Sequence, residues 1–187
     1  SYNEVNATEE SKYKLLSGER WKLGDIYHSE LKVIGPPSAK SSNANVNSEA
    51  YYRYNNAYLG RFRNGSSCGG NCAQRKNIVY VGANDGLLHA FDAKNGEELW
   101  AFLPPMLLSK MRNVISSKSG QSVSIYGVDG SPIVKDIYYN YKWRTVLMSG
   151  LGMGGRGYFA LDVTNPNNPS FLFAFSNDLI NKIVSHW

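Results

Sequence analysis

A glycine-rich run near the end of the chain has the spacing of a phosphate-binding pattern. Residues 152–157, GMGGRG, fit G-x-G-x-x-G through Gly152, Gly154 and Gly157, and the strand-like run TVLM lies upstream. In a dinucleotide site such glycines open a helix, whose N-terminus meets the pyrophosphate. Here YFALDVTNPNNP follows instead, which alternates like a strand and ends at prolines. We therefore predict a wide hairpin turn that needs glycine conformations, and not a cofactor loop.

The two cysteines form a second candidate site. Cys68 and Cys72 lie in CGGNC, without a histidine or further cysteine nearby, which makes a poor zinc site. A thioredoxin-like site would need C-x-x-C. Because Gly-Gly-Asn forms turns readily, we predict a local disulfide worth about 2 kcal/mol that pins a surface loop in an oxidising compartment. Two free thiols are the alternative.

The ionisable side chains do not form a recognisable catalytic set. His28, His89 and His186 are isolated in the sequence, and His89 alternates with apolar residues inside a strand-like run. We expect His89 to be a packed or hydrogen-bonded structural residue. Asp85, beside Gly86, is typical of a turn. The sequence therefore predicts no catalytic residue.

Composition favours an all-β protein rich in loops. The chain has 187 residues with 13 tyrosines and 18 glycines, and its net charge is +5 with the basic residues scattered. No apolar run approaches the length of a membrane span. Alternating tyrosine and arginine in YYRYNNAYLGRFR could stack nucleic-acid bases, but a loop that packs its own aromatics is commoner, and we expect no nucleic-acid partner. This possible binding loop comprises Tyr51, Tyr52, Arg53, Tyr54, Tyr58, Arg61 and Arg63.

The elements that would position these residues are short antiparallel strands. Alternation at Ile26, Leu31 and Val33 predicts a first strand, which ends at a Gly-Pro-Pro breaker. Three further strands over 78–81, 87–92 and 98–102 predict a meander, whose first hairpin turns at Asp-Gly. A proline at 105 and apolar spacing after it favour a short helix. Strands follow in YGVDGSPIVKDIYY and KWRTVLMSG.

This order of strands occurs twice, about 70 residues apart. GLLHAFDAKNGEELWAF aligns with GYFALDVTNPNNPSFLFAF, so that Asp92 matches Asp162 and Trp100 falls in the same place as Phe173. Four short antiparallel strands per repeat are typical of a β-propeller blade. We expect Asp92 and Asp162 to accept hydrogen bonds from the turns that follow them, and Trp100 to wedge between neighbouring blades.

The repeat predicts a polar lead-in over residues 1–22 and a partial propeller over 23–187. The first blade would span about 23–103 and the second about 123–176. A propeller needs roughly four to eight blades. Two blades leave sheet edges unpaired, so we expect this chain to be part of a longer one.

At these residues the chain resembles the C-terminal β-propeller domain of the PilC/PilY-type type IV pilus tip adhesins. The resemblance spans about residues 23–166 and rests on LGDIYHS, VYVGANDGLLHAFDAKNGEELWAFLPP, YGVDGSPIVKD and WRTVLMSGLGMGGRGYFALDVTNP. The second and fourth of these blocks are specific, and they occur in the right order. One departure is Leu31, where the family more often has Ser-Ser-Pro after the histidine.

The resemblance implies a secreted, non-enzymatic protein at the pilus tip or the outer membrane surface. Such proteins support pilus biogenesis, adhesion and twitching motility, so the implied partners are minor pilins and a host or surface receptor. Many members carry a calcium loop of the D-x-D-x-D-G type. The aspartates of this chain are dispersed, and we therefore expect no cofactor in this segment.

Two alternatives use the same repeat. AFDAKNGEELWAF also resembles the tryptophan-docking repeat of quinoprotein dehydrogenases, which would need a pyrroloquinoline quinone, a calcium ion and often an adjacent cysteine pair. No such ligand set is visible in the sequence. A propeller scaffold for outer-membrane assembly is the other alternative, but it lacks the continuity of GANDGLLHAFDA with the later FLPP.

Overall fold

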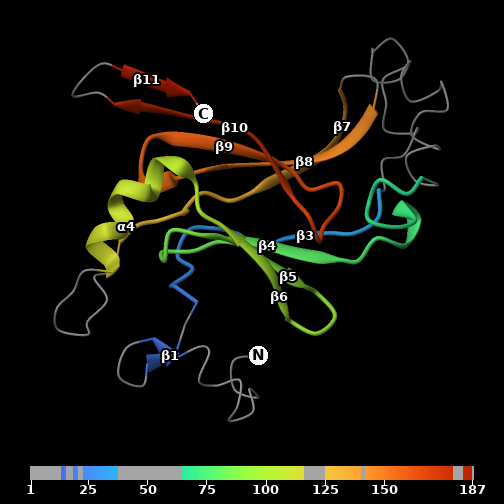
Figure 1. The fold of residues 1–187 in the computed structure, drawn as a ribbon, viewed down its shortest axis with the longest axis horizontal. Helices are drawn as coiled ribbons and strands as arrows, with labels where there is room; N and C mark the ends of the chain where they lie inside the picture. Colours follow the sequence, from blue (N-terminus) through green and yellow to red (C-terminus); the bar gives the residue numbers. More distant parts are fainter. Residues whose placement is uncertain are drawn as a thin grey trace.

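The computed structural model describes residues 14–15, 19–20, 23–37, 65–115, 125–139, 142–178 and 183–186. Within these ranges the chain forms two larger antiparallel sheets that pack against each other, with a short helix beside them (Figure 1). A hairpin near the N-terminus adds the two-residue strands β1 (Lys14–Leu15) and β2 (Glu19–Arg20).

The first sheet has four strands in the order β3-β4-β5-β6. Their bounds are β3 (Lys32–Ile34), β4 (Ile78–Gly82), β5 (Leu88–Asp92) and β6 (Glu98–Phe102). Tyr80 lies opposite Ala90, and Ala90 opposite Trp100, so one row of side chains crosses three strands on the same face. The meander predicted for residues 78–102 is confirmed.

The second sheet has five strands in the order β11-β10-β9-β8-β7. Their bounds are β7 (Ile133–Tyr139), β8 (Lys142–Gly150), β9 (Gly157–Asp162), β10 (Ser170–Asp178) and β11 (Ile183–His186). The prediction of four-stranded antiparallel units is confirmed for β7–β10, and the two sheets do not close a ring. The repeat did not predict β11. This strand pairs antiparallel with β10 at the edge of the sheet.

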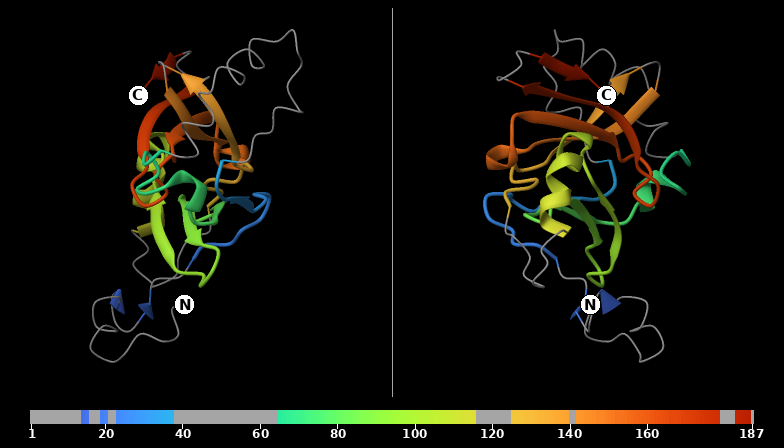
Figure 2. Two further views of the ribbon diagram at one scale, coloured as in Figure 1. Left: turned by 90° about the vertical axis from the view of Figure 1, so that its right-hand side faces the viewer. Right: turned by 60° about the vertical axis from the view of Figure 1, so that its left-hand side comes forward.

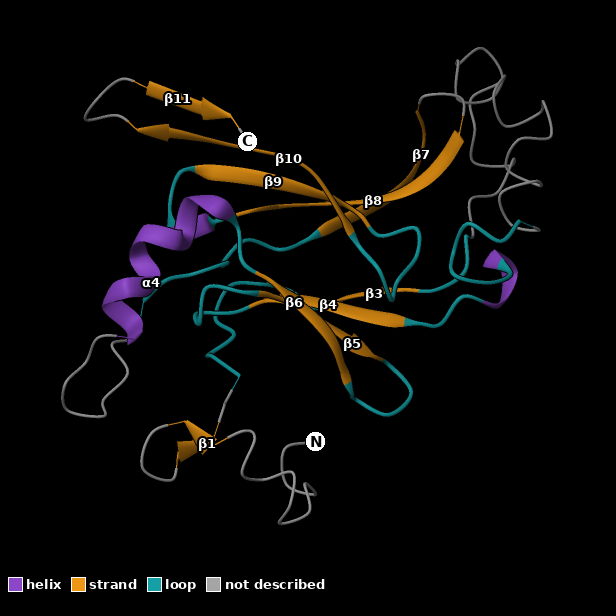
Figure 3. Ribbon diagram, in the orientation of Figure 1, coloured by secondary structure: helices purple, strands orange, loops and turns teal. Residues whose placement is uncertain are grey.

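Short helical segments connect the strands. They are the 3-10 turns η2 (Cys72–Gln74), η3 (Pro105–Leu107) and η4 (Gly152–Gly154), and the helix α4 (Leu108–Ile115). The helix expected after Pro105 is confirmed, and proline occupies the first position of η3, where its missing N–H costs nothing. Figure 3 shows α4 beside the ends of both sheets.

Figure 2 shows the two sheets from two further directions, and the core of buried side chains lies between them. Residues from both sheets form one buried apolar cluster, which also takes in Leu107 of η3. The fully buried side chains at its centre come from β4, β5, β8 and β9: Ile78, Tyr80, Leu88, Leu147, Phe159 and Leu161. Because each strand alternates, only one face of each sheet contributes to this cluster. We call this contact between the sheets the seam.

The first predicted strand is shorter than its sequence pattern suggested. Ile26, Leu31 and Val33 are all exposed, and only Lys32–Ile34 pair with β4. The residues before β3 hydrogen bond elsewhere: the N–H of His28 donates to Asp129 and that of Glu30 to the hydroxyl of Ser131. The alternation was misleading because these backbone groups are satisfied by the second sheet's leading segment instead of a ladder.

Candidate functional site

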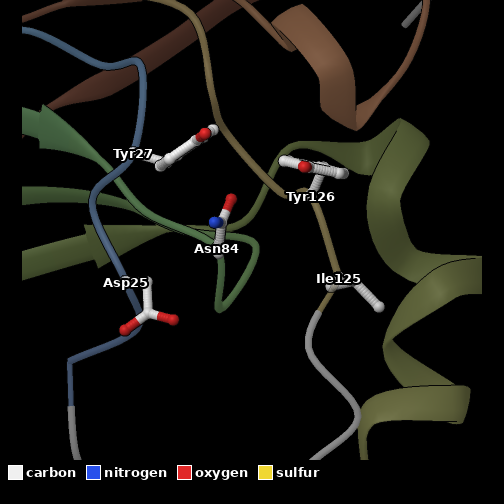
Figure 4. Close-up of a pocket in the computed structure, with 5 residues that line it drawn as sticks. All are labelled: Asp25, Tyr27, Asn84, Ile125 and Tyr126. Carbon is white, nitrogen blue, oxygen red and sulfur yellow. The ribbon is translucent and has the colours of Figure 1, made fainter.

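A shallow pocket of about 350 Å³ opens where the first sheet meets the segment that leads into β7 (Figure 4). Three stretches of chain that are far apart in sequence line it. They supply Asp25 and Tyr27 before β3, Asn84 in the β4–β5 turn, and Ile125 and Tyr126 before β7. We call this group of five residues the tyrosine pocket.

Backbone and amide hydrogen bonds tie the three stretches together. The N–H of Asn84 donates to the carbonyl of Asp25 at 2.9 Å, and the N–H of Val128 donates to the carbonyl of Ala83 at 3.0 Å. The side chain of Asn84 accepts from the N–H of Gly127 at 3.3 Å. The pocket walls are therefore fixed by the fold and do not depend on a ligand.

Asp85 shapes the turn that carries Asn84. One carboxylate oxygen accepts from the N–H of Leu87 and the other from the N–H of Gly24, both at 3.0 Å. Gly86 follows with a φ of 93°, which a side chain would strain. The Asp-Gly turn predicted from the sequence is present, and the aspartate also anchors the chain before β3.

Asp129 is a buried carboxylate at the junction of three segments. It accepts from the backbone N–H and from Nδ1 of His28, at 3.2 and 2.7 Å, and from the N–H of Met153 at 3.3 Å. His28 remains half exposed, whereas Asp129 is almost completely buried. The carboxylate thus links the segment beneath Tyr27 to the glycine-rich turn of the second sheet.

His89 is held between two carboxylates, as a structural histidine would be. Its Nδ1 lies 2.6 Å from Glu98 and its Nε2 lies 3.0 Å from Asp85, and the ring is almost fully buried. Burial alone would lower the pKa of His89, but hydrogen bonds and charge from Asp85 and Glu98 outweigh it and raise the pKa. Burial alone would raise the pKa of Asp85. Hydrogen bonds from His89 and from the N–H groups of Gly24 and Leu87 outweigh it, so the pKa of Asp85 is lowered.

The repeated aspartates have matching environments in the two sheets. Asp92 accepts from the N–H of Lys94, and Asp162 accepts from the N–H of Thr164, both at 3.0 Å. Each also pairs with a base, Lys76 for Asp92 and Arg144 for Asp162. Hydrogen bonding to Lys76 is the main cause that lowers the pKa of Asp92. The hydrogen bonds to the turns are those expected from the repeat. The ion pairs with Lys76 and Arg144 were not expected.

The glycine-rich run is a turn between two strands. Gly152 and Gly154 lie in η4, and β9 begins at Gly157 directly afterwards. A Cβ at Gly154 would overlap the carbonyl oxygen of Gly127, so the two backbones pass in contact there. Gly152 and Gly155 have φ angles of 54° and 149°. Since no helix follows, the run lacks the geometry of a dinucleotide site.

A second link across the seam follows the disulfide. Cys68 and Cys72 are bonded, as their spacing predicts, and Arg75 comes directly after η2. The buried guanidinium of Arg75 donates to the carbonyl of Gly35 after β3 and, at 2.6 Å, to the hydroxyl of Thr145 on β8. Burial lowers the pKa of Arg75. The disulfide loop thus holds a cation that bridges both sheets.

The comparison with known families is decisive for the class of protein. The model of the PilY1 beta-propeller domain matches residues 38–183 of the chain. The chain belongs to this family.

PilY1 proteins of two bacteria illustrate the similarity. The type IV pilus biogenesis factor PilY1 of Pseudomonas aeruginosa UCBPP-PA14 is 36% identical over 83% of this chain, and a PilY1 homolog of Xylella fastidiosa is 38% identical over 81%. The chain spans only 12% and 11% of these relatives' lengths. It also matches the crystal structure of the P. aeruginosa PilY1 C-terminal domain with a TM-score of 0.50 at 34% identity, covering 77% of this chain and 25% of that one.

Sequence reasoning missed several residues that the PilY1-type fold brings together. Tyr27 and Tyr126 of the pocket, and Asp129 and Arg75 of the seam, carry no local pattern of their own. Tyr27 lies in LGDIYHS, and Tyr126 and Asp129 lie in YGVDGSP, two of the blocks that support the resemblance. Family membership was therefore the available signal for these three residues.

Three further results concern the remaining predictions. The possible binding loop with Tyr51, Tyr52, Arg53, Tyr54, Tyr58, Arg61 and Arg63 lies outside the described residues. In the part of the chain that the structure describes, no cluster of three or more His, Cys, Asp or Glu side chains suits a metal ion. The described helices include none with the length and apolar character that a membrane crossing requires.

Proposed function

We propose that this chain is part of a non-enzymatic surface protein that supports type IV pilus biogenesis, with the propeller as its binding scaffold. The observation that carries the proposal is the family match over residues 38–183, together with relatives named as pilus biogenesis factors. The protein would act at the pilus tip or the outer membrane surface. There it would contact minor pilins and a host or surface receptor, and so contribute to adhesion and twitching motility.

The environments of the ionisable side chains support a binding role. Asp85, Asp92, Asp129 and Asp162 are each used in backbone hydrogen bonds that fix turns or join segments. His89 is buried between two carboxylates and away from solvent. A catalytic acid or base needs access to a substrate, and these groups are instead engaged in holding the fold.

The test is a replacement in the full-length protein of the bacterium that carries this chain. An in-frame deletion of residues 23–178 should reduce surface pili in sheared fractions and shrink twitching zones. A matched strain with Ala101→Ser, an exposed position on β6, should behave as the parent strain. Immunoblots must show that the shortened protein is made and exported. Unchanged piliation, twitching and adhesion in the deletion strain would contradict the proposal.

The proposal includes no cofactor in this segment. The thermal unfolding midpoint of the 187-residue chain should therefore be the same with calcium and with a chelator. A midpoint that rises with added calcium would show that the residues 1–187 themselves bind the ion, and this part of the proposal would be wrong.

A further inference from the structure

The tyrosine pocket exposes two aromatic rings that the core does not use. Tyr27 is 67% exposed and Tyr126 is 45% exposed. Their ring centroids are 6.4 Å apart and their planes are tilted by 47°, so the two rings are close neighbours at the surface. Exposed aromatic side chains gathered at one place are typical of binding surfaces, because a ring offers apolar area at little entropic cost.

The chain segments that carry the two tyrosines are held in position. The ring of Tyr27 meets that of His28 edge-on, with the two ring centroids 4.2 Å apart. His28 in turn is hydrogen bonded to Asp129. Tyr126 precedes Gly127, whose N–H is bound by the side chain of Asn84. A ligand would therefore meet a surface that is already arranged, which limits the ordering cost of binding.

The pocket also contains a hydrogen-bond donor. The oxygen of the Asn84 side chain must be the atom that faces Gly127, since an N–H donates to it. The Nδ2 group is therefore the part of the amide left for a ligand, and Figure 4 shows the Asn84 side chain below Tyr27 and Tyr126, with its nitrogen turned to the side. A donor at this place favours a ligand with an oxygen acceptor flanked by apolar surface.

A hydrogen-bond acceptor lines the same pocket. Asp25 is exposed, and its carboxylate has no hydrogen-bond or ion-pair partner among the described residues. Figure 4 places Asp25 on the other side of Asn84 from the two phenol groups. A carboxylate is a strong acceptor for hydroxyl groups. The pocket thus combines two ring faces with the Asn84 donor and the Asp25 acceptor within about 350 Å³.

We propose that the tyrosine pocket binds a neutral saccharide ring. Its C–H faces would contact Tyr27 and Tyr126, one hydroxyl oxygen would accept from Asn84, and another hydroxyl would donate to Asp25. A sugar ring suits this set because each hydroxyl can both donate and accept, while the ring itself offers apolar faces. This inference goes beyond the proposed function and does not depend on it.

Other ligand classes fit the pocket less well. An organic cation would be attracted by the ring faces and by Asp25, but it would also meet the N–H groups of Asn84 in the same pocket. A proline-rich peptide needs a continuous aromatic-lined groove, whereas the lining of this pocket supplies only two aromatic rings. Both classes are included in the test as outcomes that would overturn the proposal.

The test is saturation-transfer NMR on the 187-residue chain. The probes are the methyl glycosides of glucose, galactose, mannose and N-acetylglucosamine. At least one should bind with a dissociation constant on the order of 1 mM, which is the range expected for about a dozen heavy atoms in an open site. Tyr27→Ala and Tyr126→Ala should each weaken binding about 10-fold. Asp25→Asn should weaken it by a smaller factor, because the amide oxygen still accepts.

A matched control comes from another exposed tyrosine. Tyr158 on β9 is 49% exposed but lies beside Phe175, away from the pocket, so Tyr158→Ala should leave glycoside binding unchanged. Circular dichroism must show the same fold in every variant. The proposal is overturned if no glycoside binds, if binding survives in Tyr27→Ala and Tyr126→Ala, or if tetramethylammonium or a proline-rich basic peptide perturbs the pocket signals and no glycoside does.

Discussion

The indole Nε1–H of Trp100 donates to the carbonyl oxygen of Pro166 at 2.7 Å and so joins the two sheets. Trp100 lies on β6 of the first sheet, whereas Pro166 lies in the β9–β10 turn of the second. The same indole packs beside Tyr80, with ring centroids 5.8 Å apart. The wedge between blades expected from the repeat therefore has a polar partner as well as an apolar contact.

Replacing Trp100 with phenylalanine tests this contact. The variant keeps an aromatic ring but leaves the Pro166 carbonyl without its donor, so the free energy of unfolding should fall by about 1 kcal/mol or more. Urea unfolding followed by circular dichroism measures the change. Ala101→Ser, at an exposed neighbouring position, should unfold as the parent does. Equal midpoints for Trp100→Phe and the parent chain would mean that the hydrogen bond does not stabilise the seam.

The contacts that the sequence predicted well are local ones. Asp92 and Asp162 bond to N–H groups two residues ahead, so a short pattern contains both partners. The links that it could not predict join distant residues. Arg75 and Thr145 are 70 positions apart, and His28 and Asp129 are 101 apart.

The prediction of the first strand was wrong over most of its length for the same reason. Alternation at Ile26, Leu31 and Val33 looked like a buried face, but long-range bonds from His28 and Glu30 determine the path of that segment. The tyrosine pocket is likewise lined by three chain segments that come together only when the sheets are assembled. The two-residue alternation of a strand and the local pattern of an Asx turn carry no information on contacts between segments that are distant in the sequence.

The pH dependence of stability should reveal the charge on His89. Its pKa is raised in the fold above the ordinary value of 6.5, so the stability that its protonation contributes is fully present below that pH. This contribution is lost as the pH rises through the folded pKa. The free energy of unfolding of the parent chain should therefore decline above pH 6.5 relative to that of His89→Gln, which cannot be charged.

The measurement is urea unfolding at a series of pH values for both chains. Taking the difference between the chains cancels the titration of groups that the substitution does not touch. Asp85 and Glu98 face the imidazole and stay in place in both. If the two curves ran parallel across this range, the pKa of His89 would be the same in the folded and unfolded chain, and the fold would not raise it.

Removing the disulfide should destabilise the chain by about 2 kcal/mol, since it closes only a short loop. Cys68→Ala together with Cys72→Ala is the appropriate variant, because both side chains are buried and alanine adds no polar group. Urea unfolding without reductant measures the loss. Reductant should produce a similar loss in the parent and none in the variant. A parent chain equally stable in both conditions would contradict a stabilising role.

Gly154→Ala tests why the phosphate-like pattern contains glycine. The added Cβ would overlap the carbonyl oxygen of Gly127, a backbone atom that cannot rotate away, so η4 and the segment before β7 must separate. Loss of fit at a packed contact costs roughly 1–3 kcal/mol, and we expect the free energy of unfolding to fall by that amount. Met153→Ala is the matched control, since this neighbour in the same turn is 65% exposed and should be nearly neutral. If Gly154→Ala unfolds at the parent's urea concentration, close backbone approach is not the reason for this glycine.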